Sequence, residues 1–359
     1  MPEVPARDGV PASGDDRGLM LRAVARAEHA RLLAPPNPWV GAVLVTADGT
    51  SFEGHTRRPG HHHAERVVLE RAGERARGAT LYVTLEPCSH HGRTPPCVDA
   101  VLSAGVARVV VGVEDPDERV RGRGVAALRA AGVEVTVGVA ADVIASQLAP
   151  YLHQRRTGRP WVVLKLAATL DGRTAAPDGT SQWITGPDAR ADAHRLRAES
   201  DAICAGAGTI RADDPRLTVR GVVTSDGAPP REPLRVVLGT APDEAAVHPC
   251  LEWSGDLPAL LDDLGRRGVV QLLLEGGAAV AGEVHRAGLV DRYVLYLAPA
   301  LFGGDDARPL FTGPGAPTLG ELWRGEVDRV VRLGDDVRID LRPSSGPRGR
   351  GSDVADQDR

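Results

Sequence analysis

Residues 84–97 read TLEPCSHHGRTPPC, and this stretch decides how the first half of the chain is interpreted. It begins in the apolar run 79–85, which predicts a buried strand, and it ends where residues 98–104 take up helical spacing. Cys88 therefore follows a strand and Cys97 opens a helix, with a polar, glycine-containing insertion between them. A helix start stabilises a thiolate, so this pair of cysteines is well placed to bind a metal ion.

A third candidate ligand lies upstream in His63-Ala64-Glu65, which opens a helix predicted over residues 64–72. One imidazole and two thiolates suit tetrahedral Zn²⁺ and leave a fourth position for water. Zinc lowers the pKa of bound water to about 7. Glu65 is close enough to face that water without binding the metal, and a carboxylate there moves protons. His-x-Glu, then Pro-Cys, then a second Cys is the layout of zinc deaminases.

Two other interpretations of these residues stay open at this point. His61, His62 and His63 form a run of histidines that is also typical of an exposed surface. A purely structural zinc site would need four protein ligands, and His90 or His91 is near enough in sequence to be the fourth.

The rest of the chain alternates between apolar runs and helical patterns. The predicted strands of the first half are 40–45, 51–53, 79–85, 107–113 and 133–139, and its helices are 19–33, 64–72, 98–104 and 124–131. The predicted strands of the second half are 161–166, 202–205, 234–238, 270–274 and 292–298, and its helices are 187–199, 257–266 and 278–287. This alternation predicts two α/β domains, the first with a largely parallel sheet, divided at the basic stretch 155–160.

Glycines in the second half follow two of these strands. Residues 205–209 read AGAGT, and residues 275–278 read EGGA where a helix begins. Such turns let phosphate oxygens approach backbone N–H groups at a positive helix end, although tight packing explains them equally well. Neither turn fits the dinucleotide pattern Gly-x-Gly-x-x-Gly. Arg197 and Arg220 are candidates for binding a substrate phosphate.

Composition limits the classes of function. Charged residues make up 25% of the chain and the net charge is -5, which argues against a nucleic-acid partner. Aromatic residues are only 3%, so base-stacking surfaces are scarce. No apolar run is long enough to cross a membrane. The four cysteines are too few for a disulfide framework, and we expect a cytoplasmic protein.

The quoted stretch, together with Asn37-Pro38-Trp39-Val40-Gly41, resembles a bifunctional riboflavin-biosynthesis family. In that family a diaminohydroxyphosphoribosylaminopyrimidine deaminase is fused to a 5-amino-6-(5-phosphoribosylamino)uracil reductase. The resemblance implies a cytidine-deaminase-like three-layer sandwich followed by a dihydrofolate-reductase-like α/β domain. It assigns zinc to His63, Cys88 and Cys97, proton transfer to Glu65, and substrate contacts to Asn37, His90 and Arg93. His62 stands where the family usually has proline.

The same resemblance extends to the second half and implies NADPH as its cofactor. The cofactor contacts would be Ala167, Trp183, Thr209, Asp213, Thr240, Gly277, Ala278, Ala279, Val280, Ala281, Gly282 and Glu283. The substrate contacts there would be Ser181, Arg197, Arg216, Arg220 and Glu275. Gly239-Thr240 replaces an aspartate that the family usually has, and the segment from Thr240 to Leu257 is short for the family.

The resulting hypothesis is a disordered leader over residues 1–17, a deaminase over 18–150, a reductase over 158–342 and a disordered tail over 343–359. Its partners would be a pyrimidine ribosyl phosphate and further copies of the chain, with no nucleic acid and no membrane. Two rival hypotheses have less support. A nucleic-acid base deaminase is disfavoured because the cysteines are not in Cys-x-x-Cys, and a zinc-stabilised scaffold is supported only by the short segment after Thr240.

Overall fold

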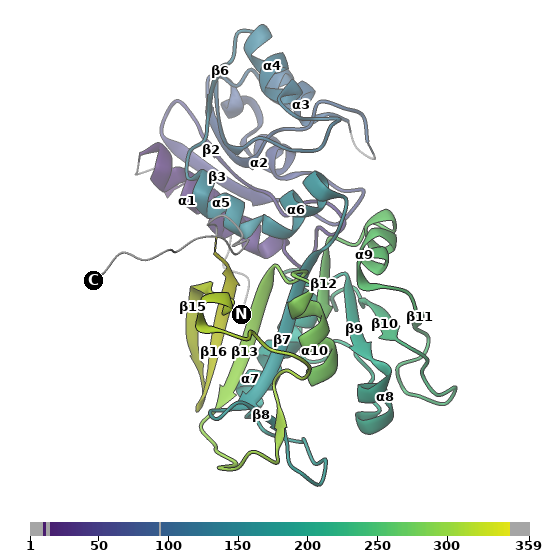
Figure 1. Ribbon diagram of the computed structural model, residues 1–359. Coiled ribbons are helices and arrows are strands. Elements are labelled where there is room, and N and C mark those ends of the chain that lie inside the picture. The colour runs from purple at the N-terminus through teal and green to yellow at the C-terminus, as the bar shows by residue number, and fades with distance from the viewer. Residues whose placement is uncertain (1–9, 12–14, 93–94, 345–359) are drawn as a thin grey trace, which may run out of the picture. The chain divides into compact units, whose positions relative to one another are not determined.

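The computed structural model describes residues 10–11, 15–92 and 95–344 (Figure 1). The chain folds into two compact units, each containing a sheet covered by helices. Unit 1 is residues 1–161 with the segments 221–232 and 261–270, and unit 2 is residues 162–220, 233–260 and 271–359. Most of the predicted leader and nearly all of the predicted tail lie outside the described residues.

Unit 1 is built on a six-stranded sheet in the order β1-β3-β2-β4-β5-β6. Its strands are β1 (Val10–Pro11), β2 (Gly41–Val45), β3 (Thr50–His55), β4 (Thr80–Leu85), β5 (Arg108–Val113) and β6 (Glu134–Val137). Only β4–β5 and β5–β6 pair in parallel, whereas β1–β3, β3–β2 and β2–β4 are antiparallel. The prediction of a largely parallel first sheet was therefore wrong. The tight turn at Gly49 (φ 78°) forces β2 and β3 to run in opposite directions.

Helices cover both faces of this sheet. They are α1 (Asp16–Ala30), α2 (Ala64–Ala72), η1 (Gly73–Ala76), α3 (Cys97–Ser103), α4 (Arg123–Ala130), α5 (Ala141–Gln147) and α6 (Ala149–Thr157). Gly41 on β2 approaches α1 so closely that a Cβ would lie 1.9 Å from the carbonyl oxygen of Ala23. A Cβ on Gly54 of β3 would likewise lie 2.8 Å from Cγ1 of Val67 on α2. Gly41 is the cross-strand partner of His55, the neighbour of Gly54, so α1 and α2 lie on opposite faces.

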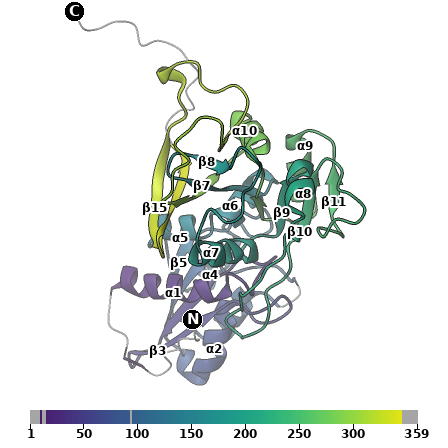
Figure 2. The ribbon, with the colours of Figure 1, turned by 90° about the horizontal axis from the view of Figure 1, so that it is seen from below.

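Unit 2 contains an eight-stranded sheet in the order β11-β10-β9-β12-β7-β13-β16-β15, running from β11 at one edge to β15 at the other (Figures 1 and 2). Its strands are β7 (Trp161–Thr169), β9 (Ala202–Gly206), β10 (Leu234–Leu238), β11 (Leu251–Trp253), β12 (Gln271–Leu274), β13 (Arg292–Ala298), β15 (Gly325–Leu333) and β16 (Asp336–Pro343). The pairs β10–β11, β9–β10, β9–β12 and β7–β13 are parallel, and β13–β16 and β15–β16 are antiparallel.

A second, two-stranded sheet and several helices complete this part of the chain. The small sheet pairs β8 (Arg173–Ala175) with β14 (Arg308–Pro309). The helices are α7 (Pro187–Ala198), α8 (Ala207–Asp213), α10 (Ala278–Arg286), η2 (Leu319–Glu321) and the beginning of α9 (Leu257–Arg266), which continues into the 261–270 segment of unit 1. No helix in the described ranges has both the length and the apolar composition that a membrane crossing requires.

Several predicted elements are confirmed to the residue, namely α2, α9, β10 and β13. The first helix begins earlier than predicted, at Asp16, because Asp15 caps it by accepting the N–H of Gly18 at 2.8 Å. The stretch 155–160 is not simply a linker, since Arg155 belongs to α6. Elements that were not predicted include α5, α6, α8, β8, β11, β14, β15 and β16.

Candidate active site

Three side chains from three different elements of unit 1 meet at one point. His63 precedes α2 as its N-cap, Cys88 follows β4, and Cys97 is the first residue of α3. The Nδ1 atom of His63 lies 3.7 Å from Sγ of Cys88 and 3.3 Å from Sγ of Cys97. Tetrahedral zinc bound to nitrogen at about 2.0 Å and sulfur at about 2.3 Å separates such donors by about 3.5 Å. The set therefore fits zinc in donor chemistry and in spacing.

The two thiols do not titrate alike. A hydrogen bond from the Cys97 thiol lowers the pKa of Cys88 to about 4, and the His63 ring adds to this effect. The backbone N–H of Cys97 also donates to the Cys88 sulfur, at 3.3 Å. The bond to Cys88 raises the pKa of Cys97, as do its burial and the nearby Glu65. Cys88 is therefore the more acidic thiol of the pair, and metal binding requires both thiols to lose their protons.

Glu65 lies beside these ligands in the first turn of α2 and is only 3% exposed. Burial raises the pKa of its carboxyl, an effect partly opposed by the charge of His63. A carboxyl of raised pKa holds a proton more readily near neutral pH, which is what a group that both accepts and donates a proton requires.

The other histidines near this site do not complete a four-ligand cluster. Among the described residues, the cluster that contains His63 has only Cys88 and Cys97 as its other members. His62 turns to the surface, where its Nδ1 lies 2.9 Å from Glu70. His90 is partly buried and His91 is exposed. The open position expected of a catalytic zinc site is therefore available.

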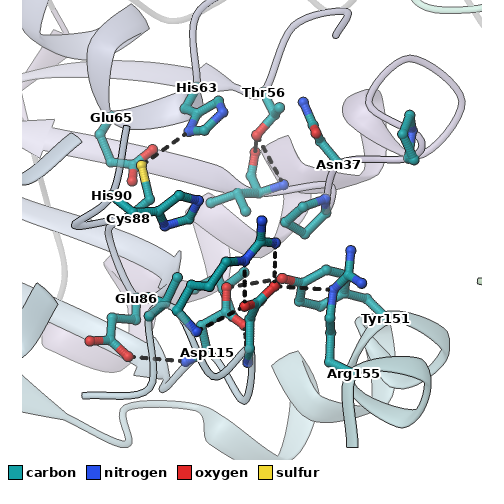
Figure 3. Close-up of a pocket in the computed structure, with 17 residues that line it drawn as sticks. Asn37, Thr56, His63, Glu65, Glu86, Cys88, His90, Asp115, Tyr151 and Arg155 are labelled. Atoms are coloured by element: carbon teal, nitrogen blue, oxygen red, sulfur yellow. Dashed lines mark hydrogen bonds and ion pairs between the residues drawn. The ribbon is translucent and has the colours of Figure 1, made fainter. Parts of the chain in front are cut away.

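His63 and Cys88 line a pocket in unit 1 together with Glu65 (Figure 3). Asn37 and His90, to which the resemblance assigns substrate contacts, line the same pocket. The Nδ1 atom of His90 is buried and has no hydrogen-bond partner among the described residues, so it is available to a ligand. Arg93, a third predicted substrate residue, lies outside the described residues.

Charged and polar residues that were not predicted form a second wall of this pocket. They are Asp115, Asp117, Arg119, Tyr151 and Arg155. The Tyr151 hydroxyl lies 3.0 and 3.1 Å from the two carboxylate oxygens of Asp115 (Figure 3). Burial raises the pKa of Asp115, whereas hydrogen bonds from Arg119 lower the pKa of Asp117 to about 2. The Asp-Pro-Asp run directly after β5 was a usable signal, because polar residues at strand ends often line sites.

In unit 2, two of the predicted glycine turns lie next to each other. The strands β9 and β12 are parallel neighbours, so the helices that follow them, α8 and α10, begin at the same edge of the sheet. A Cβ on Gly277, the N-cap of α10, would lie 3.4 Å from the Thr209 hydroxyl oxygen on α8. Backbone N–H groups at a helix start attract anionic groups such as the phosphates of a dinucleotide.

The predicted cofactor stretch 277–283 comprises the N-cap and the first residues of α10, in the place where a helix was predicted. The N–H of Ala281 donates to the Gly277 carbonyl at 3.0 Å, so the donors that point away from the helix are those of Ala278, Ala279 and Val280. Ala281 and Gly282 are buried and Glu283 is exposed. Any contact to a cofactor phosphate along this stretch is therefore expected in the first turn.

Other predicted residues of unit 2 pair with one another. The guanidinium of Arg197 binds both carboxylate oxygens of Glu275, at 2.7 and 2.8 Å. Burial alone would raise the pKa of Glu275, but Arg197 outweighs it and the net shift is downward. The Ser181 hydroxyl lies 3.4 Å from Asp213, which joins a predicted substrate residue to a predicted cofactor residue.

The remaining predicted residues are more dispersed. Trp183 is 68% exposed, with the guanidinium of Arg190 over its ring at 4.8 Å. Ala167 lies on β7 opposite Tyr296 of β13. Three of the predicted residues are exposed, namely Arg216, Arg220 and Thr240. Their side chains make no hydrogen bond or ion pair within the described ranges. Gly239 has φ 98°, a conformation that favours glycine over aspartate.

Comparison with known proteins relates both units to described families. Residues 13–113 match the cytidine and deoxycytidylate deaminase zinc-binding region, and residues 160–338 match the RibD C-terminal domain. The riboflavin biosynthesis protein RibD of Escherichia coli is 39% identical over 363 residues, covering 91% of this chain and 99% of that protein. The Mycobacterium tuberculosis protein of the same name is 43% identical over 321 residues, covering 85% of this chain and 91% of its own.

Solved structures give the same result. Acinetobacter baumannii RibD (form 1) has a TM-score of 0.86 and 36% identity, covering 92% of this chain and 99% of its own. A diaminohydroxyphosphoribosylaminopyrimidine deaminase/5-amino-6-(5-phosphoribosylamino)uracil reductase from Thermotoga maritima has a TM-score of 0.80 and 30% identity, with the same coverage. The fold is thus that of a deaminase domain followed by a RibD reductase domain.

Replacing Cys97 by serine is expected to remove one equivalent of zinc per chain. The variant loses a thiolate from a three-ligand site, and the alcohol that replaces it is a far weaker ligand. Zinc is measured by elemental analysis of purified, untagged protein. Cys204→Ala is the matched control, because Cys204 is a buried cysteine of unit 2 far from any metal-ligand cluster in the sequence. Unchanged zinc in Cys97→Ser would contradict the assignment.

Proposed function

This chain belongs to the RibD family of riboflavin-biosynthesis proteins, and from that membership we propose its two substrates. The family combines a zinc-dependent deaminase with a nicotinamide-dependent reductase. The first proposed step removes the 2-amino group of 2,5-diamino-6-(5-phosphoribosylamino)pyrimidin-4(3H)-one by hydrolysis. The second reduces the ribosyl group of the product to give 5-amino-6-(5-phosphoribitylamino)uracil. The name of the Thermotoga maritima protein supports this pair of reactions.

One observation supports the deamination above all others. The donor atoms of His63, Cys88 and Cys97 lie within 4.8 Å of one another, and the buried carboxyl of Glu65 lines the same pocket as His63 and Cys88. Zinc at these ligands would supply Lewis acidity and an activated water molecule. Glu65 would accept the proton of that water and pass it to the departing ammonia. Its raised pKa suits both halves of that transfer.

Other residues of the pocket would hold the substrate. The Asn37 amide offers both a donor and an acceptor to the polar edge of a pyrimidine, and the free Nδ1 of His90 offers a further contact. Tyr151, Asp115 and Arg155 lie across the pocket from His63 and Glu65 (Figure 3). Hydroxyl, carboxylate and guanidinium groups on that wall suit a ribosyl phosphate.

For the reduction we propose residues 158–342 as the responsible domain, with residues 18–150 carrying the deamination. The adjacent starts of α8 and α10 would bind the cofactor phosphates. A nicotinamide cofactor held there would supply the hydride that reduces the sugar carbon. The Arg197–Glu275 pair and Ser181 would orient the substrate at this edge. We propose NADPH as the nicotinamide cofactor, on the basis of the resemblance described above.

Glu65→Gln should lower the rate of deamination by at least about 10²-fold, because the amide keeps the shape but cannot carry the proton. Ammonia release is followed with the diaminopyrimidine substrate in the absence of a nicotinamide cofactor. The same preparation should reduce supplied 5-amino-6-(5-phosphoribosylamino)uracil at the rate of the unmodified protein. Loss of both reactions would contradict the assignment of deamination to one domain and reduction to the other.

For the reduction, kcat/KM should favour NADPH over NADH by at least about tenfold, a difference of about 1.4 kcal/mol. Absorbance at the nicotinamide band gives both rates with the same supplied intermediate. Equal use of the two nucleotides would overturn the choice of NADPH.

Gly277→Val should raise the KM for NADPH and leave ammonia release unchanged, because the new side chain enters the turn before α10.

We also infer self-association of the chain through β15. This strand forms one edge of the large sheet, and Val327 and Val330 on it are 60% and 62% exposed. An edge strand with exposed apolar side chains favours pairing with another chain. The double variant Val327→Lys, Val330→Lys should sediment as a smaller species than the unmodified protein. Identical sedimentation of the two would contradict β15 as the contact.

A further inference from the structure

A second group of potential metal ligands lies in unit 2. It consists of His248, Cys250 and Glu252, which alternate along the chain into β11. One donor atom from each of these three residues lies within 4.8 Å of the other two. Neither the zinc site of unit 1 nor the proposed reduction uses any of them.

The imidazole of His248 is already oriented for metal binding. Its Nε2 lies 2.9 Å from the carbonyl oxygen of Pro242, which can only accept a hydrogen bond, so Nε2 carries the proton. The lone pair of the neutral ring is then on Nδ1, which lies 3.5 Å from the Cys250 sulfur. Histidines that bind metal ions typically donate their other N–H to a carbonyl or carboxylate in this way.

The third side chain is also held by the backbone. One carboxylate oxygen of Glu252 accepts the N–H of Ala241 at 2.8 Å. Ala241 and Pro242, which fix Glu252 and His248, are consecutive residues. A single short segment therefore orients two of the three potential ligands before any ion is present, which lowers the entropic cost of binding.

We propose that His248, Cys250 and Glu252 form a second site for a divalent transition-metal ion of the zinc class. Imidazole, thiolate and carboxylate are the three donor types that zinc accepts in proteins. The separation of 3.5 Å between nitrogen and sulfur equals the spacing of about 3.5 Å expected in a tetrahedral zinc site. Hard ions such as magnesium are disfavoured by the thiolate.

An ion at this site would act on the loop at the edge of the large sheet. It would tie His248 and Cys250 to the edge strand β11, which pairs with β10. The three residues lie at the end of the loop that connects β10 to β11, and Ala241 and Pro242 near its start are hydrogen-bonded to Glu252 and His248. Binding should therefore stabilise the native state of this loop, since the same three groups are not assembled in the unfolded chain.

The test is the zinc content of the full-length protein, purified without a tag and dialysed against excess zinc and then against metal-free buffer. The unmodified chain should retain two equivalents, Cys97→Ser and Cys250→Ser one each, and the double variant none. Cys204→Ala is the matched control and should retain two. Deamination should be unchanged in Cys250→Ser, so a failure of the second site is distinguishable from a failure of the proposed function.

Cobalt substitution in the Cys97→Ser background gives an independent readout of the thiolate. It should produce a thiolate-to-cobalt charge-transfer band that disappears when Cys250→Ser is added. Glu252→Gln should weaken zinc binding at least about tenfold in competition with a chelator, while the protein keeps its fold because the amide oxygen still accepts the Ala241 N–H. The proposal is overturned if Cys250→Ser and the unmodified chain retain the same amount of zinc, or if no charge-transfer band forms.

Discussion

The convergence of one imidazole nitrogen on two sulfur atoms is the constraint on which the rest of unit 1 depends. His63, Cys88 and Cys97 come from the start of α2, the end of β4 and the start of α3, so these three ends must meet within bonding distance of one ion. Close packing makes this possible, because Gly54 lets α2 approach the sheet and Gly41 lets α1 approach the other face. The fold thereby brings Glu65 beside the metal ligands while burying it.

Local sequence patterns were sufficient to select the three candidate zinc ligands that the structure brings together, and the elements that hold them. His-x-Glu at a helix start and cysteines at a strand end and a helix start are local patterns, and α2 was predicted to the residue. The direction of the strands was harder to predict from the sequence, because helical segments also connect strands that are not neighbours in the sheet. The β3–α2–β4 segment does this, placing β2 between two strands that run opposite to it. The first sheet is mixed for that reason.

Contacts between distant parts of the chain could not be predicted from local sequence patterns. Tyr151 and Asp115 meet although α6 was not predicted, and they complete the pocket wall. Arg197 and Glu275 were each predicted to bind substrate, but the structure shows that they also bind each other, so their charges are matched before any ligand arrives. The edge hairpin β15–β16 was missed although β16 carries a local signal, because polar and apolar residues alternate along Asp336–Pro343. The Tyr151–Asp115 and Arg197–Glu275 contacts, by contrast, arise from tertiary packing.

The central claim is that one zinc ion binds His63, Cys88 and Cys97 with its remaining position open beside Glu65. The most direct test is anomalous X-ray diffraction from crystals of the zinc-loaded protein, recorded on both sides of the zinc absorption edge. The account predicts a peak at about 2.0 Å from Nδ1 of His63 and about 2.3 Å from both sulfur atoms, with no fourth protein ligand. An absent peak, or one that His90 or His91 also coordinates, would contradict it.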